Sequence, residues 1–340
     1  MSADLSPIST SIDFDKDGKQ VSFLKVPHSR NDSAWGSVLI PITVIKNGMG
    51  RTVLLLAGSH GGEYEGPVAL TKLSYALEAQ DIQGRVIIIP ALNLPAVMAG
   101  ERLSPIDSKD MNRVFPGKWN GTITEVIAHY IHEVILPLCD AVLDIHSGGY
   151  SLNLAPYISM HYLDNQIQTE QTLAALMAFQ APIGIIMREF SGSGLLDYAV
   201  EGMGKIFLCA ELGGSGRLSG HTLHIAEVGT RNFLKHFDIL QGDSMDWCIS
   251  DNETQLMEVA ESANYHIVMG NGVYESLCEL GQEVEIGQIL GQVHFIEYPS
   301  KLPEQVFASR SGTIIGIRGP SQVSIGDCVA VVAQGIKESL

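Results

Sequence analysis

The sequence predicts a mixed α/β fold with a largely buried central sheet flanked by helices, followed by a small all-β domain. Two continuous apolar runs, residues 52–57 and 85–90, suit strands that are covered on both faces. Strand-like and helix-like segments alternate up to about residue 250, as in an α/β domain. From about residue 252, short β-rich runs separated by glycine turns replace the helical periodicity. We therefore expect an α/β domain with an N-terminal arm over residues 1–250 and a β-rich, barrel-sandwich-like domain over 251–340.

The first elements form a strand–helix–strand unit behind a polar arm. A strand is expected at residues 37–45, ending at the turn Asn47-Gly48. Residues 66–79 lie between the two apolar runs and carry apolar side chains at roughly the helical period. We therefore expect a helix there, connecting two buried strands.

The following segments continue the alternation. Thr122 or Thr124 is suited to cap a helix, because a hydroxyl can accept a hydrogen bond from the first free backbone amides. The further helices are expected at 124–138, 168–179, 194–202 and 220–237, and the further strands at 141–145, 183–187 and 205–210.

The C-terminal part contains a weak internal repeat. Residues 282–290 align with residues 321–329 at an offset of 39, which predicts two copies of a strand–turn–strand unit. This pattern resembles the half-motif of biotinyl- and lipoyl-type sandwich domains. The carrier modules of that group present a lysine between the two halves, but residues 309–314 contain none, and Lys301 lies earlier in a proline-flanked loop. We therefore expect a structural or assembly role, and a homo-oligomer.

Charge and composition exclude several classes of partner. The chain has 340 residues and a formal net charge of −17, which argues against nucleic acid and anionic membranes, since both attract basic patches. No apolar run approaches the ~20 residues that a bilayer requires. The first 20 residues carry four aspartates and no apolar signal region, and the five cysteines are widely spaced. We expect a cytoplasmic protein with reduced thiols.

Polar metal-binding side chains follow two of the expected buried strands. His60 and Glu63 lie in the turn after the strand at 52–57, and His146 follows the strand at 141–145. Sites in open α/β sheets gather at the carboxyl ends of strands. Two histidines and one glutamate, with a fourth position left for water, are the ligands of a hydrolytic zinc site. Asp144 is placed either to orient a ligand histidine or to point away from it.

Two further segments carry charged side chains suited to catalysis. Arg102 can polarise a carbonyl or stabilise an oxyanion, and Asn112 with Arg113 can bind a carboxylate. The alternative for these arginines is a surface ion pair with Asp107 or Asp110. Glu211 follows the apolar strand ending at residue 210 and precedes two glycines, where it can serve as a general base or remain an ordinary loop residue.

Together these motifs resemble the succinylglutamate desuccinylase/aspartoacylase family, a branch of the zinc carboxypeptidase-like fold. The resemblance covers roughly residues 50–240, and the β-rich tail fits that family as well. It implies that His60, Glu63 and His146 bind one zinc ion per chain, and that Glu211 is the base. It also implies that Arg102 assists the carbonyl oxygen and that Asn112 and Arg113 hold the substrate's carboxylate. The longer stretch between Arg102 and Asn112 departs from the aspartoacylases.

Residues 31–37 and the insert at 104–107 resemble the ectoine-degradation branch, the Nα-acetyl-L-2,4-diaminobutyrate deacetylases. That resemblance implies a zinc-dependent amidohydrolase acting on a small N-acyl amino acid. The ammonium group of acetyl-diaminobutyrate requires an acidic or carbonyl-rich pocket, for which Glu189 and Asp197 are candidates. The alternatives are a zinc carboxypeptidase acting on short peptides and a non-enzymatic metal-binding scaffold.

Overall fold

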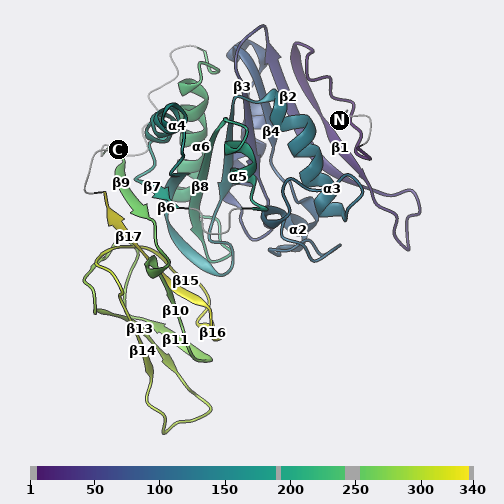
Figure 1. Cartoon of the computed structure of the whole chain (residues 1–340). Helices are drawn as coiled ribbons and strands as arrows, with labels where there is room; N and C mark the ends of the chain where they lie inside the picture. Colours follow the sequence, from purple (N-terminus) through teal and green to yellow (C-terminus); the bar gives the residue numbers. More distant parts are fainter. Residues whose placement is uncertain (1–5, 189–192, 242–252, 337–340) are drawn as a thin grey trace.

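A sheet of 13 strands runs through the computed structural model, which describes residues 6–188, 193–241 and 253–336. Figure 1 shows this sheet at the centre of the molecule, with helices on both sides and the C-terminal strands extending below. The strand order is β1-β2-β4-β3-β5-β8-β6-β7-β9-β17-β15-β12, and β10 pairs with β17. The expected mixed α/β fold is therefore confirmed.

The core of the sheet is parallel and buried. It consists of β4 (Gly84–Ile89), β3 (Thr52–Ala57), β5 (Ala141–His146) and β8 (Ile206–Gly214). Every residue of β3 and β5 is buried, which is why these strands read as continuous apolar runs. The register pairs Ala57 with Ile145 and His146 with Glu211, so the polar ends of three strands meet at one edge.

Two strands were not expected from the sequence. β1 (Gly18–Pro27) pairs antiparallel with β2 (Ser37–Asn47), where we expected a polar arm. It forms one edge of the sheet, so much of it faces solvent and its apolar pattern is weak. β6 (Leu152–His161) lies antiparallel to β8 and parallel to β7 (Ile183–Met187). Pro156 obscures β6 in the sequence, and it lies where the register with β8 shifts.

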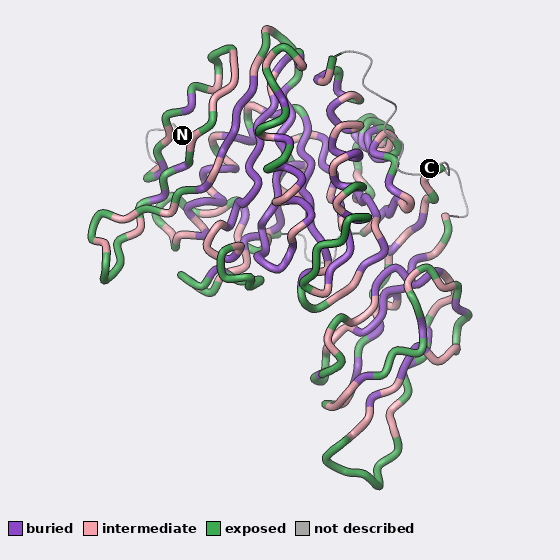
Figure 2. Tube along the Cα trace, turned by 180° about the vertical axis from the view of Figure 1, so that it is seen from behind, coloured by how far each residue is buried: buried purple, intermediate pink, exposed green. Residues whose placement is uncertain are grey.

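Helices cover the sheet on both faces. One core contains residues of α1 (Glu65–Ala76), α4 (Gln166–Phe179) and α6 (Gly220–His236). The other contains residues of α3 (Ile123–Tyr130) and α5 (Leu196–Glu201). Figure 2 shows the buried residues concentrated in the strands between these layers. The short helix α2 (Leu94–Ala99) follows β4.

The helix expected at 124–138 is wrong in its continuity. α3 ends at Tyr130 and is followed by a π-helical segment, Ile131–Ile135, and a 3₁₀ segment, Leu136–Leu138. Pro137 explains the change, because its ring cannot supply the backbone amide that an α-helix needs at that position. Thr122 is the N-cap and forms a reciprocal capping box with Glu125. The remaining 3₁₀ segments are Ala79–Asp81, Met111–Arg113 and Ser262–Asn264.

The C-terminal strands extend the central sheet and add a second one. The extension contains β9 (Gln255–Val259), β17 (Cys328–Gly335), β15 (Gly312–Arg318), β12 (Glu283–Val284) and β10 (Tyr265–Ile267). The second sheet has the order β14 (Glu304–Phe307), β13 (Ile289–His294), β11 (Gly272–Ser276) and β16 (Gln322–Val323). β15 also pairs with β6, which joins the C-terminal part to the catalytic part of the chain.

The internal repeat corresponds to two equivalent turns. One connects β12 to β13 and the other connects β16 to β17, with Gly287 and Gly326 at positive φ angles of 84° and 92°. Positive φ at both positions favours glycine, since it carries no Cβ. The expected domain boundary at residues 250 and 251 lies outside the described residues. No helix in the described part of the chain is long and apolar enough to span a bilayer.

Candidate active site

Three buried side chains converge where β3 and β5 end. His60 and Glu63 lie in the turn after β3, and His146 is the last residue of β5. His60 Nδ1 lies 2.7 Å from Glu63 Oε1, and His146 Nδ1 lies 2.9 Å from Glu63 Oε2. One possible ligand atom from each residue falls within 4.8 Å of the others. The structure thus brings together the three side chains that the sequence selected as metal ligands.

Carboxylates hold the outer nitrogens of both imidazoles. His60 Nε2 lies 3.0 Å from Asp110 Oδ1, and His146 Nε2 lies 2.8 Å from Asp144 Oδ2. An Nε2–H that donates to a carboxylate leaves the Nδ1 lone pair free to bind a metal. Asp144 therefore points toward His146, which settles the alternative left open by the sequence.

The charges around the two imidazoles shift their protonation. Burial disfavours the protonated form, but the surrounding carboxylates outweigh burial and raise the pKa of both His60 and His146. Burial would likewise raise the pKa of Glu63, but the two imidazoles lower it below its ordinary value. The pKa of Asp110 is also lowered, because His60 and Arg102 outweigh its burial. Without a metal, positive charge on the imidazoles balances the buried carboxylates.

A glycine permits the tight turn that carries two of these side chains. A Cβ on Gly61 would lie 1.8 Å from the backbone oxygen of Ala96, which is closer than any real contact. The Gly61 amide donates to the Glu101 oxygen at 2.8 Å. The turn between His60 and Glu63 is therefore backed directly by the α2 region and by the segment that leads to Arg102.

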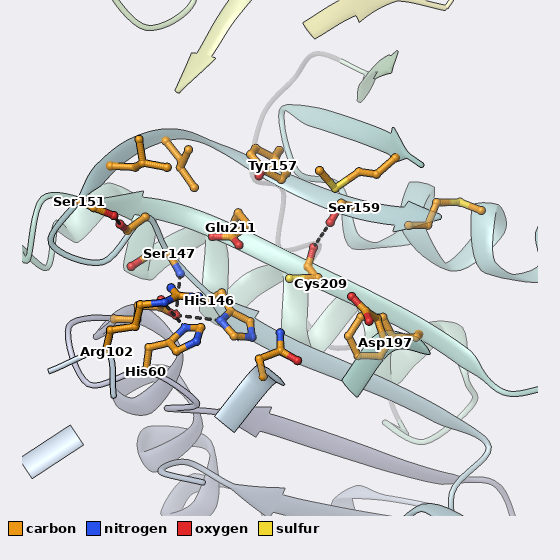
Figure 3. Close-up of a pocket in the computed structure, with 18 of the residues that line it drawn as sticks. His60, Arg102, His146, Ser147, Ser151, Tyr157, Ser159, Asp197, Cys209 and Glu211 are labelled. Atoms are coloured by element: carbon orange, nitrogen blue, oxygen red, sulfur yellow. Dashed lines mark hydrogen bonds and ion pairs between the residues drawn. The ribbon is translucent and has the colours of Figure 1, made fainter. Parts of the chain in front are cut away.

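Glu211 lies beside the cluster on the next strand. It is paired in register with His146, and Figure 3 shows it above the two histidines. Its Oε2 atom is buried without a hydrogen-bond partner among the described residues. Burial raises the pKa of Glu211, and Glu63 adds to that effect, although His146 opposes it. A carboxyl group with a raised pKa and an unpartnered oxygen is suited to exchange protons with a bound molecule.

Arg102, Asn112 and Arg113 line the same cavity. The Arg102 guanidinium donates to Asp110 Oδ2 at 3.0 Å, so the expected alternative of an ion pair with Asp110 is present in the structure. Its side chain remains 53% exposed. Asn112 Oδ1 accepts a hydrogen bond from the Leu196 amide at 2.8 Å, which leaves the Asn112 NH₂ group as the donor for a ligand.

The cavity has a volume of about 290 Å³ and extends along β8 and β6. Alternate residues of β8 line it, namely Glu211, Cys209 and Phe207. Alternate residues of β6 line the adjacent side, namely Tyr157, Ser159 and His161. In Figure 3, His60 and Arg102 lie at one end and Asp197 lies at the other, with Cys209 between them.

Sequence reasoning missed two parts of this site. Asp110 was considered only as an ion-pair partner, yet it also holds His60, 50 residues away. The contribution of β6 was missed with the strand itself. The signal available for both was weak, because each depends on a long-range contact. Glu189, a candidate for contacting the substrate side chain, lies outside the described residues, as does most of the expected substrate loop at 191–194.

The donor set fits a zinc ion. Two imidazole nitrogens and one carboxylate oxygen are borderline ligands of the kind that zinc prefers. The Asp110 and Asp144 contacts orient both imidazoles with their Nδ1 atoms toward Glu63. Asp110, Asp144 and Glu63 would offset the charge of a divalent cation. His60, Glu63 and His146 are therefore the residues that would hold the metal.

Comparison with known proteins gives consistent matches over most of the chain. The succinylglutamate desuccinylase/aspartoacylase catalytic domain matches residues 49–237. The N-alpha-acetyl-L-2,4-diaminobutyric acid deacetylase of Halomonas elongata is 43% identical over 335 residues, which cover 98% of this chain and 97% of that protein.

Solved structures give the same result. The product-bound ectoine utilization protein EutE (DoeB) of Ruegeria pomeroyi has a TM-score of 0.92 and 43% identity, over 97% of this chain and 99% of that one. A succinylglutamate desuccinylase/aspartoacylase from Rhodobacter sphaeroides has a TM-score of 0.92 and 39% identity, over 98% and 100% of the two chains. This chain belongs to the succinylglutamate desuccinylase/aspartoacylase family.

Proposed function

We propose that this chain is a zinc-dependent deacylase with a zinc carboxypeptidase-like catalytic core. Its substrate would be N-acetyl-L-2,4-diaminobutyrate, and its products acetate and L-2,4-diaminobutyrate. The observation that carries the proposal is the position of Glu211, whose unpartnered buried oxygen lies beside the His60, Glu63 and His146 cluster. The relative from Halomonas elongata, named as a deacetylase of this compound, supports the choice of substrate.

The proposed chemistry divides the site into an ion and the side chains around it. A zinc ion held by His60, Glu63 and His146 would polarise the acyl carbonyl and acidify the attacking water. Glu211 accepts the proton from that water and delivers it to the leaving amine, for which a carboxyl group with a raised pKa is suited. Arg102 donates to the developing oxyanion from the mouth of the cavity.

Asn112 and Arg113 bind the α-carboxylate of the substrate. Arg113 supplies the charge and Asn112 a neutral donor, a combination that suits a carboxylate. Both residues belong to the segment that carries Asp110, since the 3₁₀ turn Met111–Arg113 begins at that residue. The groups that bind the substrate and the group that orients His60 therefore share one short segment.

The test is acetate release by the metal-replete protein from a panel of N-acetyl, N-succinyl and N-formyl amino acids, with dipeptides alongside. We expect acetyl-diaminobutyrate to be hydrolysed, and activity to be lost on chelation and restored by zinc. Glu211→Gln should lower kcat by about 10²- to 10⁴-fold without altering zinc content. Full activity in Glu211→Gln would contradict its role as base. Cleavage of dipeptides alone would instead identify a carboxypeptidase, and stoichiometric zinc without any hydrolysis would identify a metal-binding scaffold.

A further inference from the structure

We propose that Asp197 binds the side-chain ammonium group of the substrate at the end of the cavity away from the metal-binding cluster. This inference rests on the proposed function and adds the residue that distinguishes a diamino acid from other N-acyl amino acids. Asp197 lines the same cavity as Glu211 and His146, and its side chain is 15% exposed.

The described carboxylates that line the cavity leave one for this purpose. They are Glu63, Asp197 and Glu211. Glu63 is engaged by two imidazoles, and Glu211 is the proposed base. Asp197 Oδ1 accepts a hydrogen bond from the Tyr198 amide at 2.6 Å. Because an ionised carboxylate offers about four acceptor positions, this contact leaves capacity for a further donor.

The surroundings of Asp197 favour a cation. His161 Nε2 lies 3.9 Å from Asp197 Oδ2, and His161 Nδ1 lies 3.0 and 3.1 Å from the two oxygens of Glu201. Two carboxylates around one imidazole carry a net negative charge even when that imidazole is protonated. The side chains of His161 and Glu201 are 12% and 10% exposed, so water weakens this field less than at an open surface.

The length of the cavity fits the proposed ligand. Glu211 and Phe207 are four residues apart on β8, which spans about 13 Å at ~3.3 Å per residue. In acetyl-diaminobutyrate, five bonds separate the acyl carbon from the side-chain nitrogen, a span of about 6 Å when extended. A contact of about 3 Å at each end brings the total to about 12 Å. A substrate with its acyl carbon near Glu211 can therefore place its ammonium group near Asp197.

The segment that binds the α-carboxylate also fixes the position of Asp197. The Phe115 amide donates to the Gly194 oxygen at 3.0 Å, and the Leu196 amide donates to Asn112 Oδ1 at 2.8 Å. Gly194 has a φ of +90°, and a Cβ there would lie 2.6 Å from the Arg113 oxygen. These contacts hold the start of α5, and with it Asp197, against Asn112 and Arg113. The groups proposed to bind the carboxylate and the ammonium are thus fixed relative to each other.

The experiment compares two substrates of nearly equal size. Nα-acetyl-L-2,4-diaminobutyrate and Nα-acetyl-L-norvaline differ in whether the side chain ends in an ammonium or a methyl group. In Asp197→Asn we expect kcat/KM for the diamino substrate to fall about 10- to 100-fold, mainly through KM, because a charge-assisted hydrogen bond is lost. We expect kcat/KM for acetyl-norvaline to change less than threefold. Equal losses on both substrates, or no loss on either, would overturn the assignment.

Two controls and one binding measurement complete the test. Asp197→Glu keeps the charge and should retain part of the preference for the diamino substrate. Asp164→Asn removes an exposed carboxylate outside the cavity and should change neither substrate. Titration calorimetry with L-2,4-diaminobutyrate gives a readout without hydrolysis: Asp197→Asn should bind it about tenfold or more weakly. If the wild-type protein binds this compound through Asp197 but cleaves neither substrate, the proposed function fails and the assignment of Asp197 stands.

Discussion

At the scale of single residues, the site is organised by carboxylates that contact the outer nitrogens of histidines. Asp110 and Asp144 each hold one imidazole of the predicted metal site. Asp110 also accepts from Arg102 at 3.0 Å, so the same carboxyl group orients a ligand and positions the residue proposed to stabilise the oxyanion. This shared role makes Asp110 the more informative of the two carboxylates to alter.

We expect Asp110→Asn to lower the affinity for zinc by about 10- to 100-fold, because an amide orients His60 less strongly than a carboxylate does. The measurement is competition for zinc against a chelator of known affinity. Arg102→Gln is the matched control, since it removes the other partner of Asp110 and leaves the His60 contact in place. Equal affinity losses in the two variants would contradict a role for Asp110 through His60.

The turn after β3 illustrates how one small residue permits the arrangement of two ligands. We expect Gly61→Ala to lower both Tm and zinc affinity, because the added Cβ would overlap the Ala96 carbonyl oxygen. Gly220→Ala is the control: a Cβ there meets nothing within 4 Å. Thermal unfolding with and without zinc provides the comparison. A Gly61→Ala protein with wild-type Tm and zinc affinity would show that the close approach to α2 does not restrict this turn.

At the scale of elements, α3 begins with a reciprocal capping box. The Thr122 amide donates to Glu125 Oε2 at 2.8 Å, and Lys109 lies 3.4 Å from Glu125 Oε1. The Thr122 amide is the main cause that lowers the pKa of Glu125 to about 2, from an ordinary value of 4.5. The ionised carboxylate therefore stabilises the folded state more than the unfolded one.

We expect Glu125→Ala to reduce the free energy of unfolding by about 1 kcal/mol near neutral pH. Since the folded-state pKa is depressed, this contribution is present above pH 4.5 and declines as the pH falls toward 2. Denaturant unfolding of both proteins between pH 3 and 7 measures the difference. Thr122→Ser retains the capping hydroxyl and should behave like the wild type. A difference that grows on acidification would contradict the direction of the pKa shift.

At the scale of the whole molecule, the C-terminal strands are part of the sheet that carries the site. β15 pairs with β6 through Gly316 and Leu154, and Leu154 also lines the cavity. One buried cluster combines residues of the catalytic part with residues of the C-terminal part: Leu154, Tyr157, Ile185, Met257, Val259, Ile315, Val331 and Ala333. The C-terminal part therefore supports one wall of the cavity.

We expect calorimetry to show a single unfolding transition, because separating the C-terminal strands would expose this shared cluster and the β6 edge. Ile315→Ala removes a fully packed side chain from the cluster and should lower the temperature of that whole transition. Leu302→Ala is the control, since Leu302 is 84% exposed. Two separate transitions, with only one shifted by Ile315→Ala, would show that the two parts unfold independently.

The sequence by itself determined the central strands and the residues at their ends. β3 and β7 were predicted with their observed bounds, and β5 and β8 nearly so, because strands buried on both faces are marked by local apolar runs. The polar residues that end these runs, His60, His146 and Glu211, lie together because parallel strands end at one edge. This information is local, so the sequence carries it directly.

Only the tertiary structure decided the features that depend on distant partners. β1 and β6 lack a clear apolar run, since β1 lies at an edge and β6 is interrupted at Pro156. Asp110 reaches His60 across 50 residues, and Asp197 reaches the cavity through α5 and its contact with Asn112. Hydrogen bonds between polar side chains leave no periodic pattern in a sequence. Their positions follow from how the strands and loops pack, which the folded chain alone establishes.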